Sequence, residues 1–116
     1  MKTILNSFLF FSVISCLVVP ALAQQGSSVF GYGSGPCSAY LEAYKDRGDE
    51  KTRFDSWIGG FVTGTGYHVP KLRSSLLNVR MPEAQAWIAN YCRKKPQAFF
   101  VEAVEQFTFY VYNRNK

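Results

Sequence analysis

The sequence predicts an all-α fold, a small four-helix domain with one intramolecular disulfide that follows a cleaved signal peptide. Apolar residues recur at spacings of three and four along most of the chain after residue 36, as they do on one face of an α-helix. Pro82 and Pro96 stand where helices can begin. Two cysteines remain once the apolar N-terminus is removed, which is typical of a small disulfide-bonded exported domain.

Residues 1–23 have the pattern of a secretory signal peptide, with a single basic residue, a long apolar stretch and an Ala-Leu-Ala cleavage site. Polar residues interrupt the stretch and no basic cluster follows it, which argues against a permanent membrane anchor. We expect the mature chain to begin at Gln24 and to reside in the periplasm. Lipid attachment at Cys16 is the alternative, but the hydrophobic residues that follow Cys16 continue the signal core.

Cleavage of 23 of the 116 residues leaves 93, enough for one domain and too few for two. Residues 24–36 are rich in Gly and Ser and predict a flexible leader, so residues 37–116 make up the single helical domain. Cys16 is lost with the signal, and Cys37 and Cys92 are expected to pair in an oxidising compartment. Their disulfide would close a loop of about 55 residues and stabilise the domain by about 4 kcal/mol.

The first helix is expected to start at Cys37, because apolar residues at helical spacing follow it as far as Tyr44. The turn at residues 46–49 ends this helix. The second helix is expected to begin near Lys51, with Thr52 as the N-cap and Asp55 completing a capping-box-like pair. Its apolar face would hold Phe54, Trp57, Ile58, Phe61 and Val62.

Three small residues, Ser56, Gly60 and Gly64, recur every four positions of this second helix, beside Trp57 and Phe61. Two glycines in a helix interior are costly, which indicates a packing reason. Such a row lets another backbone approach closely. We expect these five residues to mark tight helix packing inside the domain or an interface between two protomers of a homodimer.

Residues 66–81 are polar and interrupted by Pro70, so we expect an irregular loop there. Pro82 is expected in the first turn of the third helix, and Pro96 to open the fourth. The tail from residue 107 to 112 alternates in a way that also fits a strand, but a lone terminal strand would need a partner. We therefore expect a helix or a frayed end.

Charge and residue content argue against several classes of function. The net charge is +5, and +4 after Lys2 leaves with the signal, but the basic residues are scattered and an exported protein has little access to nucleic acid. Two distant cysteines and one histidine cannot make a tetrahedral metal site, so no metal or other cofactor is expected.

We expect no enzymatic activity. His68 is the only histidine, and a catalytic histidine needs a partner that orients it. Asp49 and Glu50 are adjacent on a turn among basic residues, which indicates a solvated charge cluster. With both cysteines in a disulfide, no nucleophile remains, and catalytic residues are predicted to be absent.

The aromatic content points instead to protein binding. The chain has 10 Phe, 7 Tyr and 2 Trp, and only Phe8, Phe10 and Phe11 lie in the signal. A domain of this size cannot bury all of the rest, and aromatic residues are enriched at binding hot spots. We expect a protein partner or unfolded clients to contact a set of these rings, namely Trp57, Trp87, Phe99, Phe100 and Phe107.

Three segments resemble the HdeA/HdeB superfamily of small periplasmic helical proteins. They are Cys37-Ser-Ala-Tyr40-Leu-Glu42, Trp57-Ile-Gly-Gly60-Phe-Val-Thr-Gly64, and Trp87-Ile-x-x-Tyr91-Cys92-Arg-Lys-x-Pro96. The similarity extends from Cys37 to about Phe107. Its most specific element is the step in which the second cysteine ends one helix and a proline starts the next.

The resemblance implies an acid-stress chaperone, which binds unfolded clients through apolar surface exposed at low pH. A more distant resemblance to the Tai-type amidase immunity proteins implies the alternative, a periplasmic inhibitor of one specific toxin or enzyme. Those proteins usually carry a further cysteine near the C-terminus, and this chain has none after Cys92. Acid triggering requires carboxylates that lose their partners on protonation, and this chain has only 8 acidic residues.

Overall fold

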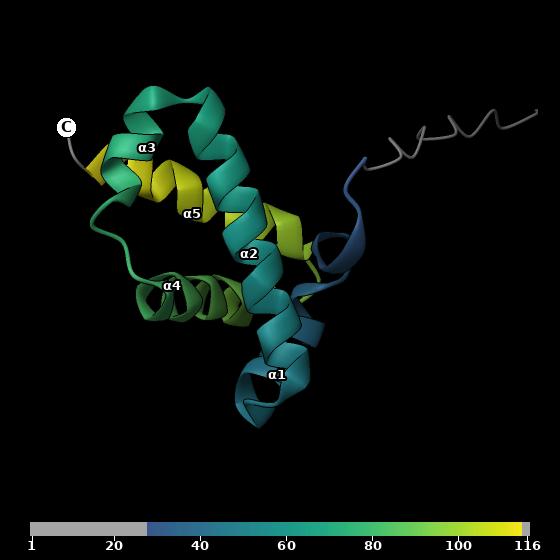
Figure 1. Ribbon diagram of the computed structural model, residues 1–116. Coiled ribbons are helices and arrows are strands. Elements are labelled where there is room, and N and C mark those ends of the chain that lie inside the picture. The colour runs from purple at the N-terminus through teal and green to yellow at the C-terminus, as the bar shows by residue number, and fades with distance from the viewer. Residues whose placement is uncertain (1–27, 115–116) are drawn as a thin grey trace, which may run out of the picture.

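The computed structural model describes residues 28–114, which form an all-α domain closed by the expected disulfide (Figure 1). Its elements are a short 3-10 helix, η1 (Gly31–Ser34), and five α-helices: α1 (Cys37–Asp46), α2 (Asp49–His68), α3 (Pro70–Leu76), α4 (Met81–Lys94) and α5 (Phe100–Arg114). The all-α class is confirmed, and the expected number of four helices is corrected to five α-helices in this part of the chain.

The additional helix, α3, lies in the segment expected to be a loop. Pro70 occupies the first turn of α3, where a backbone N–H has no partner within the helix and the fixed φ of proline suits the helix. The proline therefore starts a helix instead of interrupting one. Leu72 and Ser75 are the buried residues of α3, which packs against α2 and α5.

The first helix follows the prediction, and the start of the second does not. Arg47 ends α1 in the left-handed conformation, with φ 56° and ψ 26°. Gly48 is then the N-cap of α2, and Asp49 and Glu50 lie in its first turn, where carboxylates interact favourably with the helix dipole. The prediction of Thr52 as N-cap is wrong, because its N–H already bonds to the carbonyl of Gly48.

The connection between α4 and α5 pairs with the chain that precedes α1. The N–H of Cys37 donates to the carbonyl of Ala98 (2.8 Å), and the N–H of Ser38 donates to that of Pro96 (2.9 Å). Residues 96–99 are thus held outside a helix, and α5 begins at Phe100 instead of at Pro96. Pro82 lies in the first turn of α4, as expected.

The described part of the leader, residues 28–36, lies against the domain. The indole N–H of Trp57 donates to the carbonyl of Phe30 at 2.9 Å, and the ring of Tyr32 packs edge-on against Phe54 with centroids 4.6 Å apart. The carbonyl of Gly35 accepts from the N–H of Phe100. The signal peptide with Cys16, and residues 24–27 of the leader, lie outside the described residues.

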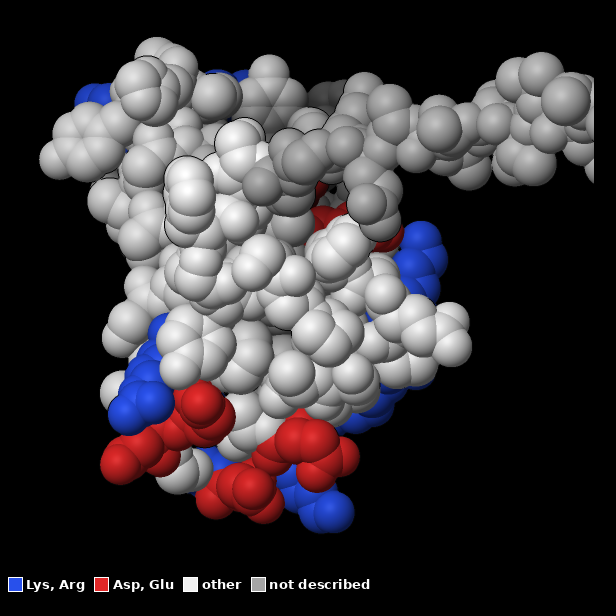
Figure 2. Space-filling view, turned by 90° about the vertical axis from the view of Figure 1, so that its right-hand side faces the viewer, with Lys and Arg blue, Asp and Glu red and all other residues white. Residues whose placement is uncertain are grey.

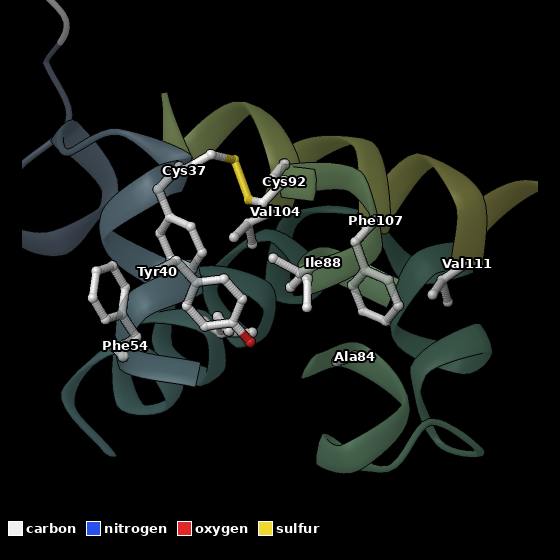
Figure 3. Close-up of a cluster of buried hydrophobic side chains, with 14 of the residues drawn as sticks. Cys37, Tyr40, Phe54, Ala84, Ile88, Cys92, Val104, Phe107 and Val111 are labelled. Carbon is white, nitrogen blue, oxygen red and sulfur yellow. A yellow bond between two sulfur atoms is a disulfide. The ribbon is translucent and has the colours of Figure 1, made fainter. Parts of the chain in front are cut away.

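Figure 3 shows Tyr40 and Phe54 toward one end of the core and Phe107 with Val111 toward the other, so both ends contain aromatic side chains. Tyr40, Phe54 and Phe100 form a cluster with ring centroids 4.7 to 5.4 Å apart. The Cys37–Cys92 disulfide joins α1 to α4, and both cysteines are fully buried. Within residues 28–114, no helix has both the length and the apolar character needed to cross a membrane.

Candidate binding surface

The polar residues that sequence analysis considered for chemistry are dispersed. Within the described ranges, no three His, Cys, Asp or Glu side chains lie close enough together to hold a metal ion. His68 is the last residue of α2 and is exposed. Glu50 accepts a hydrogen bond from the hydroxyl of Tyr32 at 2.7 Å, so this carboxylate ties the leader to α2.

Two tyrosines that could be considered as acid–base groups are held neutral. Burial, followed by the charge of Asp55, raises the pKa of Tyr40 far above its usual range. Burial and a hydrogen bond to Glu102 also raise the pKa of Tyr91. Both hydroxyls therefore keep their protons to a higher pH than an ordinary tyrosine, and each hydroxyl joins two helices through its hydrogen bond.

The row of small residues does not bring two helices of the domain together. A Cβ added at Gly60 or Gly64 would meet no atom of residues 28–114 within 4 Å, and both glycines are exposed. Ser56 donates to the carbonyl of Thr52 on its own helix. Within the described part of the chain, α2 is therefore not in tight contact with another helix at Gly60 and Gly64, so packing between helices of the domain does not explain these glycines.

The five rings expected to bind a partner occupy different environments. Phe100 and Phe107 are fully buried in the core. Trp57 is partly covered by the leader and stacks on Phe61 with centroids 5.2 Å apart. Trp87 is partly buried and stacks on both Tyr91 and Tyr110. Phe99 alone of the five is largely exposed, at 60 %.

Other exposed apolar side chains were not predicted. The most exposed of them are Phe30 at 85 %, Leu77 at 81 %, Tyr67 at 70 % and Phe109 at 58 %. Phe30 lies in the expected leader and Leu77 in the expected loop, so neither was assigned a face. Phe109 could have been found, because a helical period through the buried Phe107 and Val111 places it on the outer side of α5.

A groove of about 710 Å³ lies where α2, α3 and α5 meet; we call it the α2–α5 groove. Its volume is within the range of ligand and peptide sites. Side chains from all three helices, and from the residue before α3, line it: Phe61, Thr65, Val69, Leu72, Glu105, Thr108, Phe109, Tyr112 and Asn113. Phe61 is the only predicted site residue in this groove.

Charged side chains are unevenly distributed over the described surface. Figure 2 shows acidic and basic side chains gathered at the end of the domain where α1 meets α2, while most of the described face above them is uncharged. Glu50 and Arg53 form a 3.9 Å ion pair at this end. Much of the described face shown in Figure 2 is therefore available for apolar contact.

Comparison of the chain with protein-family models, with curated proteins and with solved structures finds no match.

Proposed function

We propose that the mature protein is a non-enzymatic periplasmic protein that binds other proteins, and that it acts as an acid-stress chaperone similar to HdeA and HdeB. The observation that carries protein binding is the exposure of large apolar side chains on a domain that also has fully buried aromatic residues. Phe30, Leu77 and Phe109 are each more than half exposed, although Phe100, Phe107 and Tyr40 are fully buried. Exposed aromatic and aliphatic side chains favour association with protein surfaces.

Acid sensitivity is supported by carboxylates that join different elements. Glu83 on α4 forms an ion pair with Arg114 on α5, and Glu102 on α5 accepts from the hydroxyl of Tyr91 on α4. Glu50 holds the leader through Tyr32. In strong acid the chain is strongly cationic, and the repulsion between its positive charges favours loosening of the packing of α5 and of the leader.

Loosening at these contacts would expose the rings that the folded domain covers. Trp87 and Phe107 lie together between α4 and α5, with ring centroids 5.6 Å apart. Trp57 and Phe100 lie beneath the leader, 5.7 Å apart. The Cys37–Cys92 disulfide joins α1 to α4 and limits the expansion, so that apolar surface is presented without complete unfolding.

An aggregation assay tests this function. The mature protein should prevent aggregation of an unrelated client at about pH 2 to 3, and not at pH 7. The double variant Glu83→Gln/Glu102→Gln imitates protonation of the α4–α5 contacts and should protect at a higher pH than the wild type. Glu42→Gln is the matched control, because Glu42 lies exposed on α1. Equal protection at neutral and acid pH, or none at either, would refute the acid-triggered role.

The alternative is an immunity or inhibitor protein that binds one specific toxin or enzyme. The observation that favours it is that Phe30 and Phe99 are exposed in the folded state, and so need no acid to reach a partner. A pull-down from periplasm at neutral pH separates the two roles. One stoichiometric partner, together with no client protection in acid, supports the inhibitor.

A further inference from the structure

Two adjoining hollows lie where the end of α2, α3 and the start of α4 meet. Their volumes are about 360 and 200 Å³, and both are lined by Thr63 and Leu76, so they form one continuous surface. We call five of the exposed residues that line the two hollows the α3 surface: Tyr67, Arg73, Leu77, Arg80 and Met81. The α3 surface combines apolar side chains with positive charge.

The apolar members of the α3 surface extend into solvent. Leu77 is 81 % exposed, Tyr67 is 70 % exposed and Met81 is 38 % exposed. Side chains that protrude in this way suit a partner without a fixed shape, because a shaped partner would need a matching cavity for each of them. The apolar layer of a lipid bilayer is such a partner.

The charged members of the α3 surface are both arginines. The guanidinium of Arg73 donates to the backbone carbonyls of Gly66 (3.3 Å) and Tyr67 (2.9 Å) and lies 5.2 Å from the centroid of the Tyr67 ring, so it is held beside that ring. Neither Arg73 nor Arg80 forms an ion pair with another residue of the described chain. Guanidinium groups bind phosphate through two parallel N–H groups, and tyrosine is enriched at the headgroup level of membranes.

Acidic residues are concentrated at the other end of α2. The sequence has none between Asp55 and Glu83, and Glu83 pairs with Arg114. Most of the 8 acidic residues precede residue 56, namely Glu42, Asp46, Asp49, Glu50 and Asp55. The 20 residues of α2 span about 30 Å, and Figure 1 shows α3 beside the end of α2 that is remote from α1. An anionic partner would therefore meet attraction at the α3 surface and carboxylates at the far end.

We propose that the α3 surface binds the surface of an anionic lipid bilayer. Leu77 and Met81 enter the outer part of the acyl layer, while Arg73 and Arg80 contact headgroup phosphates and Tyr67 lies at headgroup level. Two cations and a few apolar side chains give weak, reversible binding, which requires no membrane-spanning helix. An acidic protein could use the same arginines, but it would need a cavity for each protruding side chain. The membrane contact does not depend on the function proposed above.

Vesicle flotation tests the proposal. At about 50 mM salt, where screening is modest, the mature protein should bind vesicles of equimolar phosphatidylcholine and phosphatidylglycerol and should not bind vesicles of phosphatidylcholine alone. Arg80→Gln should weaken binding about fivefold, the effect of one cation near an anionic surface. Leu77→Ser should weaken it at least about fivefold, because it removes the most exposed apolar side chain of the α3 surface. The tryptophan of Leu77→Trp should emit at shorter wavelength on the anionic vesicles.

Matched controls separate the α3 surface from general effects of charge and exposure. Lys45→Gln changes the net charge as Arg80→Gln does, and Phe99→Ser removes an exposed apolar side chain elsewhere, so neither should alter binding. Phe99→Trp should show no vesicle-dependent shift, and circular dichroism should show every variant to be folded.

Three results would overturn the proposal: no binding to the anionic vesicles, equal binding to both kinds of vesicle, or unchanged binding by both Arg80→Gln and Leu77→Ser. Polyglutamate that binds the wild type but not these two variants, without any vesicle binding, would assign the α3 surface to an acidic protein instead. Acid protection of clients by a protein that does not bind anionic vesicles would overturn the membrane contact and leave the proposed function intact.

Discussion

The backbone of Gly33 lies so close to the indole ring of Trp57 that a Cβ at residue 33 would come within 2.0 Å of it. The same indole donates its N–H to the carbonyl of Phe30. The short leader is therefore fixed against α2 in one register by a close contact and a hydrogen bond. Its glycine is required for space and not for flexibility.

Replacement of this glycine should release the leader. We expect Gly33→Ala to lower the free energy of unfolding by about 2 kcal/mol, because the methyl group forces the Trp57 ring to move. Urea unfolding measures the loss, and a red shift of the tryptophan emission should accompany it. Gly35→Ala is the control, since its Cβ would lie at an ordinary 3.5 Å from the nearest atom. Equal losses in both variants would contradict the close contact.

The open glycines of α2 should respond in the opposite direction. We expect Gly60→Ala and Gly64→Ala each to raise the free energy of unfolding by about 0.5 to 1 kcal/mol, because alanine has the higher helix propensity and meets no atom within 4 Å. Thermal unfolding and sedimentation measure stability and mass. A destabilised variant, or a change of oligomeric mass, would show that this row contacts a second chain after all.

Loss of the disulfide should destabilise the domain strongly. Cys37 and Cys92 are separated by 55 residues, and the chain-entropy model gives about 4 kcal/mol for a loop of this length. We expect the double variant Cys37→Ala/Cys92→Ala to be largely unfolded or marginal at 37 °C, since small domains have little stability to spare. Circular dichroism with and without reductant on the wild type provides the comparison. Unchanged unfolding after complete reduction would refute this account.

The alkaline stability of the domain should depend on Tyr40. Burial raises its pKa above the value in the unfolded chain, so the folded state retains the proton longer. The resulting stabilisation is complete below about pH 10 and is lost as the pH rises further, by about 1.4 kcal/mol per pH unit. Tyr40→Phe should flatten this decline in urea titrations.

At pH 7 the same substitution should cost no more than about 1 kcal/mol, because it removes only one long hydrogen bond, to the carbonyl of Gln85. Tyr67→Phe is the control, since Tyr67 is 70 % exposed. An alkaline decline of equal slope in Tyr40→Phe and the wild type would assign the effect to other groups.

The sequence predicted those parts of the fold that depend on local pattern. Helical spacing located α1, and Pro82 located the start of α4, because both signals lie within one or two turns of chain. The disulfide was predicted from the two cysteines that remain after signal cleavage and from the oxidising compartment that we expect for an exported protein. The start of α5 was missed because Pro96 is held by a hydrogen bond from Ser38, a residue far away in sequence.

The surface was less predictable than the helices. Aromatic content indicated that some rings are exposed but not which, and Phe100 and Phe107 prove to be core residues. The row of small residues on α2 predicted close packing, yet no atom of the described chain lies within 4 Å of a Cβ placed at Gly60 or Gly64. The α2–α5 groove depends on how α3 lies against α5, a tertiary relationship with no local sequence pattern.

The contacts between the start of the domain and the α4–α5 connection affect how the chain folds during its synthesis. Cys37 has its disulfide partner at residue 92 and its hydrogen-bond partner at Ala98, and Gly35 has its own at Phe100. A growing chain emerges N-terminus first, and α1, with 10 residues, is too short to be stable alone. Every product truncated before Cys92 therefore keeps a free thiol at Cys37 and lacks the hydrogen bonds from Cys37 and Ser38 to the α4–α5 connection, which leaves it open to proteolysis. These contacts can form only after the chain has been made as far as Phe100.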